Sequence, residues 1–132
     1  MAQRVLIVDD DMDTVEMLGI WFEAPNFEFH SAGSVKTAKA LINANVFDLV
    51  LLDNWLPDGN GVEICREIRS RYSNLPVIFY SGAGYPEDIA QALEAGCCAY
   101  LVKPCSIEEL DRVVKLVAGV RLLERDDNRL SH

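Results

Sequence analysis

A short apolar block that ends in a carboxylate constrains this chain more than any other feature. Leu49–Leu52 contains only apolar residues, and Asp53 follows it directly. An unalternated apolar run of this length is typical of a strand covered on both faces in a parallel sheet. Such sheets bind ligands at the carboxyl ends of their strands, so Asp53 lies where function is expected. A loop with the turn residues Pro57, Gly59 and Gly61 follows.

The rest of the chain alternates strand patterns with helix patterns. The expected strands are residues 4–8, 27–32, 49–52, 77–80 and 99–102. The expected helices are 14–23, 35–43, 62–72, 86–95 and one that begins after Ser106 and reaches Glu124, with Asp11 or Asp13 capping the first and Ser34 the second. Short connections between them predict one doubly wound α/β domain over residues 1–124, with five parallel strands and five helices. Residues 125–132 are polar, and we expect a frayed tail.

Charge and hydropathy exclude several classes of partner. The 132 residues contain 12 basic and 21 acidic side chains, a formal net charge of −9, which disfavours direct binding to nucleic acid or an anionic membrane. The first expected strand begins at Arg4, which leaves no room for a signal peptide, and no apolar run approaches a membrane span. We expect a cytoplasmic protein.

The four cysteines, Cys65, Cys97, Cys98 and Cys105, lack the paired spacing of a zinc site, and the absence of a secretory signal disfavours a disulfide framework. We expect them to be small buried apolar residues. Cys105 lies two residues from Lys103, and a nearby cation is expected to lower its thiol pKa.

Polar residues follow four of the expected strands: Asp9 and Asp10 the first, Asp53 the third, Ser81 the fourth and Lys103 the fifth. Parallel strands end at one edge of the sheet, so these side chains are expected to converge on one pocket. Three carboxylates repel one another and raise at least one pKa unless a cation lies among them, and Mg²⁺ is the cation that best suits carboxylate oxygens.

Taken singly, each residue has a simpler interpretation. Asp9 and Asp10 suit helix caps, Ser81 a turn, and Lys103 a solvated charge. Because these side chains are expected to meet in one pocket, a chemical role is favoured instead. A carboxylate beside Mg²⁺ is a competent nucleophile for phosphoryl transfer, and the product would be an aspartyl phosphate at Asp53. The Lys103 ammonium and the Ser81 hydroxyl would bind the phosphoryl oxygens.

Four segments resemble a known family. They are Val8-Asp9-Asp10-Asp11, Asp53-x-x-Leu56-Pro57-x-x-x-Gly61, Tyr80-Ser81-Gly82 and Ala95-Gly96-x-x-x-Tyr100-Leu101-x-Lys103-Pro104. Together they resemble the response regulator receiver domain of two-component signalling, over residues 4–123. The resemblance implies a flavodoxin-like fold and a signalling switch rather than a metabolic enzyme, whose only chemistry is gaining and slowly losing its own phosphoryl group.

The resemblance also implies individual roles. Asp53 would accept the phosphoryl group from a sensor histidine kinase or a histidine phosphotransfer protein. Mg²⁺ would be bound by Asp53, directly by Asp10, through water by Asp9, and by the backbone carbonyl of Trp55. Ser81 and Tyr100 would form the switch, remodelling the face made by the fourth helix, fifth strand and fifth helix, and Lys103-Pro104 would be a cis peptide.

Trp55 departs from the usual pattern. It stands two residues beyond the acceptor, where the resemblance places a side chain over the phosphoryl group, and Ala83, two beyond Ser81, has no polar group. We expect Trp55 to hinder the attacking water and to lengthen the phosphorylated lifetime. The simpler interpretations are a loop aromatic or a partner anchor for Trp55, and a core residue for Tyr100.

The last expected helix has two apolar rows. Leu110, Val113, Val114 and Val117 would pack on the sheet, and Leu116, Val120 and Leu123 form a second row. That second row is compatible with packing inside the domain, with a homodimer through the switch face, or with a neighbouring segment.

Two other functions compete. Asp11-Met12-Asp13-Thr14-Val15 matches the nucleophile pattern of haloacid-dehalogenase-type phosphohydrolases, but Asp11 lies past the strand end, and neither an acidic pair after Lys103 nor a cap domain is present. The other is a degenerate receiver that binds partners without phosphorylation, which the complete acidic, hydroxyl and lysine set disfavours. The cognate kinase and the output stay open.

Overall fold

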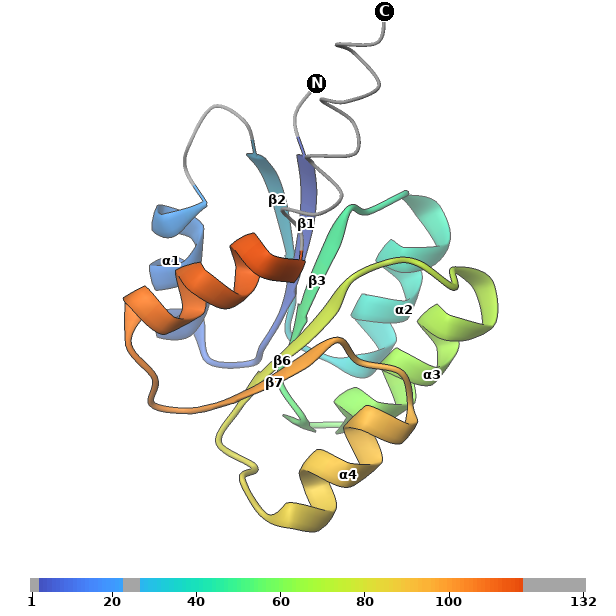
Figure 1. Ribbon diagram of the computed structural model, residues 1–132. Helices are drawn as coiled ribbons and strands as arrows, with labels where there is room; N and C mark the ends of the chain where they lie inside the picture. The colour runs from blue at the N-terminus through green and yellow to red at the C-terminus, as the bar shows by residue number, and fades with distance from the viewer. Residues whose placement is uncertain (1–2, 23–26, 118–132) are drawn as a thin grey trace, which may run out of the picture.

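A computed structural model describes residues 3–22 and 27–117 as alternating strands and helices (Figure 1). The strands are β1 (Gln3–Val8), β2 (Phe27–Ala32), β3 (Leu49–Leu52), β4 (Trp55–Leu56), β5 (Gly59–Asn60), β6 (Val77–Ser81) and β7 (Ala99–Val102). The helices are α1 (Met12–Trp21), α2 (Val35–Ala44), α3 (Gly61–Arg71) and α4 (Pro86–Glu94), followed by a C-terminal helical segment over residues 107–117.

The main sheet has five parallel strands in the order β2-β1-β3-β6-β7. β3 lies at its centre, paired with β1 on one side and β6 on the other. All four of its residues are buried, as expected of a strand with helices on both faces. The doubly wound five-stranded fold predicted from the sequence is confirmed.

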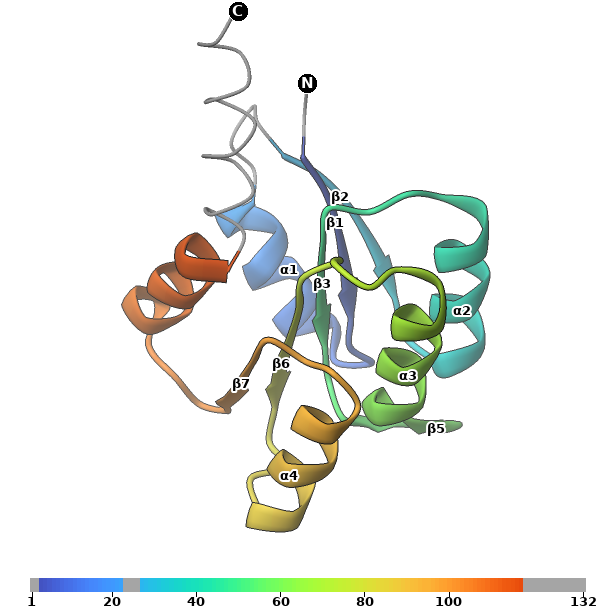
Figure 2. The same cartoon turned by 45° about the vertical axis from the view of Figure 1, so that its right-hand side comes forward.

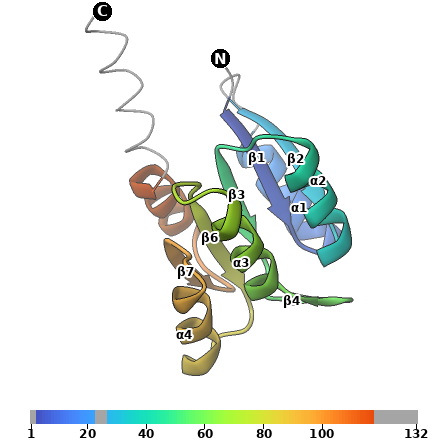
Figure 3. The same ribbon diagram turned by 90° about the vertical axis from the view of Figure 1, so that its right-hand side faces the viewer.

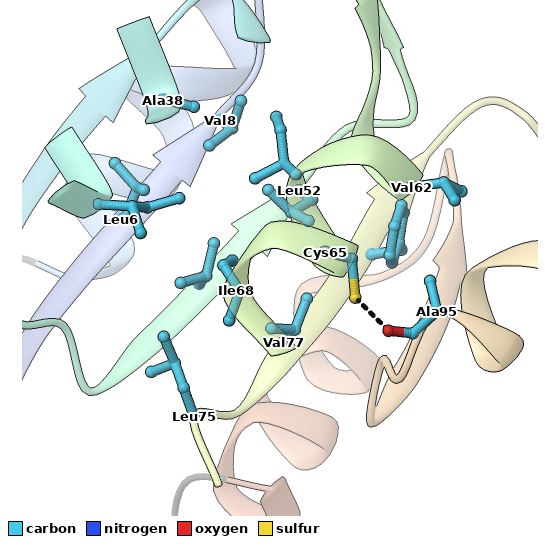
Figure 4. Close-up of a cluster of buried hydrophobic side chains, with 14 of the residues drawn as sticks. Leu6, Val8, Ala38, Leu52, Val62, Cys65, Ile68, Leu75, Val77 and Ala95 are labelled. Carbon is cyan, nitrogen blue, oxygen red and sulfur yellow. Dashed lines mark hydrogen bonds between the residues drawn. The ribbon is translucent and has the colours of Figure 1, made fainter. Parts of the chain in front are cut away.

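The strands send alternate side chains into two separate cores, because successive residues of a strand point to opposite faces. Leu6, Val50 and Phe79 pack with residues of α2, α3 and α4. Their neighbours Ile7, Leu51 and Ile78 pack instead with residues of α1 and of the segment 107–117. Figure 2 shows the two layers, with the sheet between α1 and the C-terminal segment on one side and α2 and α3 on the other. Figure 4 shows part of the first core, where the Cys65 thiol donates to the Ala95 carbonyl oxygen at 3.5 Å.

Polar side chains begin the helices. Asp11 caps α1, and its Oδ1 accepts from the Asp13 backbone N–H at 3.0 Å. Of the two caps considered from the sequence, the first is therefore correct, and α1 begins at Met12 rather than at residue 14. Ser34 caps α2 as predicted, and the Ser106 hydroxyl accepts from the Glu109 N–H at 3.1 Å.

The loop after β3 contains a small hairpin that the sequence did not predict. Its two strands, β4 and β5, are antiparallel, and the hairpin extends beyond the main sheet (Figure 3). Asp58, at its turn, accepts from the backbone N–H of Val35 at 2.7 Å and of Lys36 at 3.0 Å, which ties the hairpin to the first turn of α2. A Cβ at Gly61 would lie 2.5 Å from the Asp53 carbonyl oxygen, so only glycine allows α3 to begin this close to β3.

The cysteines agree only in part with expectation. Cys65 is buried, and burial raises its pKa to about 11, whereas Cys98 is exposed. The expectation for Cys105 was wrong: burial, with a contribution from the charge of Glu109, raises the pKa of its thiol, and Lys103 does not lower it. The Lys103 ammonium instead contacts Asp9 at 2.6 Å.

The C-terminal segment 107–117 packs Leu110 and Val114 into the second core, as expected, while Leu116 has 62% of its surface exposed. Val120, Leu123 and the expected end of this helix lie outside the described residues, as does the tail 125–132. None of the helices described is long and apolar enough to cross a membrane.

The Asp58 contact gives a pH-dependent prediction. Its two backbone hydrogen bonds lower the pKa of the Asp58 carboxyl below the value of an unfolded chain. A depressed pKa contributes stability that is fully present above the unfolded value and is lost as the pH falls through the folded value. Asp58→Asn is therefore expected to lower the melting temperature at neutral pH, and its difference from the wild type should shrink as the pH falls below the ordinary carboxyl pKa of 3.8. Thermal melts across this range check it, and a pH-independent difference would contradict it.

Candidate functional site

Backbone hydrogen bonds between strands hold the polar residues at the carboxyl edge of the sheet. The Asp9 N–H donates to the Ala32 carbonyl at 2.9 Å and the Asp53 N–H to the Val8 carbonyl at 2.8 Å. On the other side of β3, the Lys103 N–H donates to the Ser81 carbonyl at 2.9 Å. The parallel register thus continues one residue beyond the strands and fixes where these side chains start.

The three predicted carboxylates come together. One oxygen from each of Asp9, Asp10 and Asp53 can be chosen so that all lie within 4.8 Å of one another. Asp9 and Asp53 are buried, whereas Asp10 is exposed. Among the described residues this is the only group of three or more acidic, histidine or cysteine side chains close enough to share a metal ion.

Lys103 joins two of these carboxylates across the sheet edge. Its Nζ lies 2.6 Å from Asp9 Oδ2 and 3.7 Å from Asp53 Oδ2. Burial alone lowers the pKa of Lys103, but the hydrogen bond with Asp9 and the charges of both carboxylates outweigh it, so the pKa lies above its ordinary value. The ammonium therefore stays charged at neutral pH. The Lys103–Pro104 peptide bond is cis, in agreement with the resemblance.

The pKa of Asp9 is raised, but mainly for a different reason from the one expected. Burial is the largest cause, and repulsion from Asp53 adds to it. The hydrogen bonds from Lys103 and from the Asp11 backbone N–H lower this pKa without cancelling the rise. Lys103 alone therefore does not compensate the carboxylates fully, and a divalent cation would reverse the balance.

Ser81 is completely buried and connects Asp53 to its surroundings. Its hydroxyl donates to Asp53 Oδ1 at 2.7 Å. Ser81 Oγ in turn accepts from the backbone N–H groups of Asn54 and Ala83, each at 3.2 Å. Movement of Ser81 would therefore alter the contacts of Asp53, of the residue after it and of the loop before α4.

Trp55 lies beside the acceptor with an exposed side chain. Its backbone N–H donates to Asp53 Oδ1 at 3.3 Å, and 58% of its surface is accessible to solvent. A Cβ built on Gly82 would lie 3.9 Å from the indole Cζ3, so the ring lies over the chain next to Ser81. It is not a core residue.

Tyr100 is half-buried on β7. Its ring stacks on Phe79 with centroids 5.2 Å apart and planes 6° apart. Its hydroxyl donates to the carbonyl oxygen of Ala83, in the loop that also bonds Ser81. Ser81 and Tyr100 thus share Ala83, which brings the two predicted switch residues together.

The sequence reasoning missed two residues near the site. No role was predicted for Asn54, yet it is buried and its backbone N–H donates to Ser81 Oγ. Asp58 was treated as part of a loop, yet it anchors the hairpin that contains Trp55. A second polar residue, directly after Asp53, was the available signal for Asn54. The position of Asp58 between a proline and a glycine gave no comparable signal.

The arrangement fits a hard divalent cation. Mg²⁺ prefers carboxylate oxygens and retains several waters, and here two buried carboxylates stand beside one that is open to solvent. Asp9, Asp10 and Asp53 would hold the ion, which would supply charge neutralisation to an incoming phosphoryl group. The Lys103 ammonium and the Ser81 hydroxyl are placed to bind further oxygens of such a group.

Comparison with known proteins agrees with this chemistry. The sequence profile of the family described as "Response regulator receiver domain" matches residues 5–115. The chain is 36% identical over 132 residues to the response regulator protein PilR of Pseudomonas aeruginosa, covering 97% of this chain and 30% of PilR. The chain spans between 28% and 54% of the length of the first curated relatives that it matches.

Solved structures show the same fold. A CheY-like receiver domain protein from Methanospirillum hungatei superposes with a TM-score of 0.88 at 27% identity, covering 94% of this chain and 99% of the other. The receiver domain of the sensor histidine kinase PA1611 from Pseudomonas aeruginosa, which holds a magnesium ion in its active site cleft, has a TM-score of 0.79 at 24% identity and covers 90% and 99%.

The acidic cluster predicts a stabilising effect of Mg²⁺. A ligand that binds only the folded protein stabilises it by about 2.7 kcal/mol at a concentration about 100 times its dissociation constant. Thermal melts should show that Mg²⁺ raises the melting temperature of the wild type and has little effect on Asp10→Asn, whose side chain is exposed. Glu16→Gln, an exposed change on α1, should respond like the wild type. An equal response of Asp10→Asn would exclude this site.

Proposed function

Because the chain belongs to the response regulator receiver domain family, we propose that it is a phosphorylation-dependent switch whose phosphoacceptor is Asp53. The observation that carries the proposal is the position of the Asp53 carboxylate. One oxygen accepts from Ser81 at 2.7 Å, and the other faces the Lys103 ammonium at 3.7 Å. Asp9 and Asp10 complete an acidic cluster around it.

The proposed reaction is transfer of a phosphoryl group from a phosphohistidine. A carboxylate oxygen of Asp53 attacks the phosphorus, the bond from phosphorus to the imidazole nitrogen breaks, and that nitrogen retains the electron pair. Lys103 stabilises the charge on the phosphoryl oxygens, and Ser81 donates its hydroxyl to one of them. Mg²⁺ bound by Asp9, Asp10, Asp53 and the Trp55 backbone carbonyl would neutralise charge; a magnesium ion in the related PA1611 receiver domain supports this assignment.

The proposed output follows from the shared contacts of Ser81 and Tyr100. Phosphorylation adds roughly two negative charges at Asp53. Ser81 turns toward them, which changes its bonds to the backbone of Asn54 and Ala83. Ala83 also receives the Tyr100 hydroxyl, so the change reaches the face formed by α4, β7 and the segment 107–117. A local charge event thereby biases a two-state surface.

The partners proposed are a histidine kinase or a histidine phosphotransfer protein as donor, and an attached domain or a separate protein as target. The PilR relative extends well beyond the aligned region, which supports an attached output domain. The switch face exposes Val102, Ile107 and Leu116, so a homodimer through it is a further proposal. Cytoplasmic location and the absence of direct nucleic-acid contact stay predictions from the sequence.

Acetyl phosphate provides the direct test. With Mg²⁺, intact mass spectrometry should show a single phosphoryl addition to the wild type and none to Asp53→Asn, because the amide is not nucleophilic. Melting curves of the variant control for folding.

The competing functions predict other results. A folded wild type that gains no phosphoryl group would indicate a receiver that binds partners without phosphorylation. Continuous phosphate release from many small phosphoesters would indicate a hydrolase.

Trp55 should control how long the phosphoryl group persists. Its exposed ring lies next to Ser81 and, with an indole N–H as its only polar group, has no acceptor to orient an attacking water molecule. Trp55→Asn is expected to accelerate dephosphorylation several-fold after removal of acetyl phosphate, as followed by intact mass. Ile20→Asn, which changes an equally exposed apolar residue on α1, should leave the rate unchanged. An unchanged rate in Trp55→Asn would refute the shielding role.

A further inference from the structure

The strand β2 forms one edge of the main sheet, and within the described part of the chain it pairs only with β1. Figure 3 shows β2 and β7 at opposite margins of the sheet. The six residues of β2 pair with β1 in an unbroken register, and they include neither lysine nor proline. Short strands, bulges, lysine and proline are the usual protection of an edge, because its free backbone groups can pair with a further strand. This edge has none of them.

The backbone of β2 directs hydrogen-bonding groups outward at every second residue. The Ala32 carbonyl accepts from the Asp9 N–H at 2.9 Å, so the backbone groups of Ala32 point toward β1. Successive residues of a strand alternate in this respect, so the groups of Phe27, Phe29 and Ser31 point away from β1. Each of these three residues therefore offers one donor and one acceptor to a strand that would lie beside β2.

Phe29 adds an aromatic surface at the middle of this edge. The end of its ring lies against α1, because a Cβ built on Gly19 would be 2.8 Å from the Phe29 Cζ. Even so, 43% of the Phe29 surface is exposed. Its neighbours Glu28 and His30 point to the opposite face of the sheet. The edge thus combines an apolar side chain on one face with an acid and a base on the other.

The acid and the base have groups left to offer. Arg4 Nη2 lies 3.3 Å from His30 Nε2 and can only donate, so in the neutral ring Nε2 accepts and Nδ1 carries the proton. His30 can therefore donate from Nδ1 to a carboxylate. The Glu28 oxygens lie 3.5 Å from Arg4 Nε and from His30 Nε2, farther than in a good hydrogen bond. Both oxygens can accept another donor.

We propose that β2 pairs with β2 of a second copy of this chain, antiparallel and centred on Phe29. In this register Phe29 lies opposite Phe29 of the second copy, and Phe27 lies opposite Ser31. All the outward backbone groups of these residues are then hydrogen-bonded, and the two phenylalanine rings cover each other's exposed surface. On the other face, each Glu28 lies opposite His30 of the other copy, at a position where side chains approach closely.

Other registers are less favourable. A register centred between two residues would place outward backbone groups opposite groups that already bond β1, so no ladder could form. A register centred on Glu28 would bring two carboxylates together, and one centred on His30 would bring two imidazoles together, which is unfavourable for like charges. Only the register centred on Phe29 satisfies the backbone groups, the rings and the charges together. It also gives a closed dimer with two-fold symmetry.

Such a dimer would leave both candidate sites open. The two sheets would join into one, with β7 at both outer ends. Because the central pairing is antiparallel, the carboxyl edges of the two sheets, with their acidic clusters, would face opposite directions. The contact contains neither Asp53 nor the face formed by α4, β7 and the segment 107–117, so the dimer is expected with or without phosphorylation. A single pair of strands buries little surface, so the dissociation constant should lie in the micromolar range.

Sedimentation velocity of the full chain at increasing concentration tests the contact. The wild type should show a reversible equilibrium between monomer and dimer. Ser31→Pro removes an outward N–H at an exposed position, and proline is tolerated on edge strands. It should weaken the dimer by about tenfold or more, because both copies lose a hydrogen bond. Ser31→Ala keeps the N–H and should dimerise like the wild type. Melting curves show whether each variant is folded.

An exchange of the acid and the base tests the register. Glu28→His places two imidazoles opposite each other, and His30→Glu places two carboxylates opposite each other, so each variant alone should dimerise more weakly than the wild type. In an equimolar mixture of these two variants, every acid can again lie opposite a base. The mixture should therefore form more dimer than either variant alone at the same total concentration.

Three results would overturn the contact through β2. They are a wild type that stays monomeric at the highest concentration reached, a dimer that Ser31→Pro leaves intact, and a mixture that associates no more than its components. A dimer that Leu116→Glu abolishes while Ser31→Pro does not would assign self-association to the switch face instead. None of these results bears on phosphorylation of Asp53, so the proposed function stands or falls separately.

Discussion

The coverage of β3 on both faces is the constraint on which the rest of the structure depends. Its four buried residues divide between two cores, and its neighbours β1 and β6 are held parallel to it. A strand in this position has no solvent-facing side, so polar groups gather where it ends. Asp53 is the first residue after the strand, and its backbone N–H still bonds the Val8 carbonyl of β1. Strand packing and backbone bonding therefore position Asp53 independently of the contacts of its own carboxylate.

Charge interactions determine the properties of the site at this edge of the sheet. The sheet edge brings carboxylates together with one ammonium, and burial keeps their interaction strong. Burial raises the pKa of Asp9 by more than its hydrogen bond with Lys103 lowers it. A divalent cation would stabilise such a site, and the phosphoryl charge of the proposed reaction would perturb it strongly. The burial and the clustered charge that destabilise the fold at this site would also make the site sensitive to an added charge.

The hydrogen bonds of Ser81 link this charged site to a surface. One buried hydroxyl contacts Asp53, Asn54 and Ala83, and Ala83 receives Tyr100. These contacts join residues of four different segments. Within the described part of the chain, the buried side-chain Oδ1 of Asn54 has no hydrogen-bond partner. Residues that are unfavourable for local stability are expected at functional sites, because function rather than stability selects them there.

The sequence by itself determined the fold class, the order of the strands and helices, and the residues that the strand ends carry to one edge. These follow from periodicity, caps and the geometry of parallel sheets, which act over short stretches of chain. Only the tertiary structure decided that Asp58 anchors a hairpin to α2, that Lys103 does not lower the pKa of Cys105, and that Asn54 is buried with its backbone bonded to Ser81. The physical reason is that hydrogen bonds and charge interactions depend on distances between residues remote in sequence, which only packing sets.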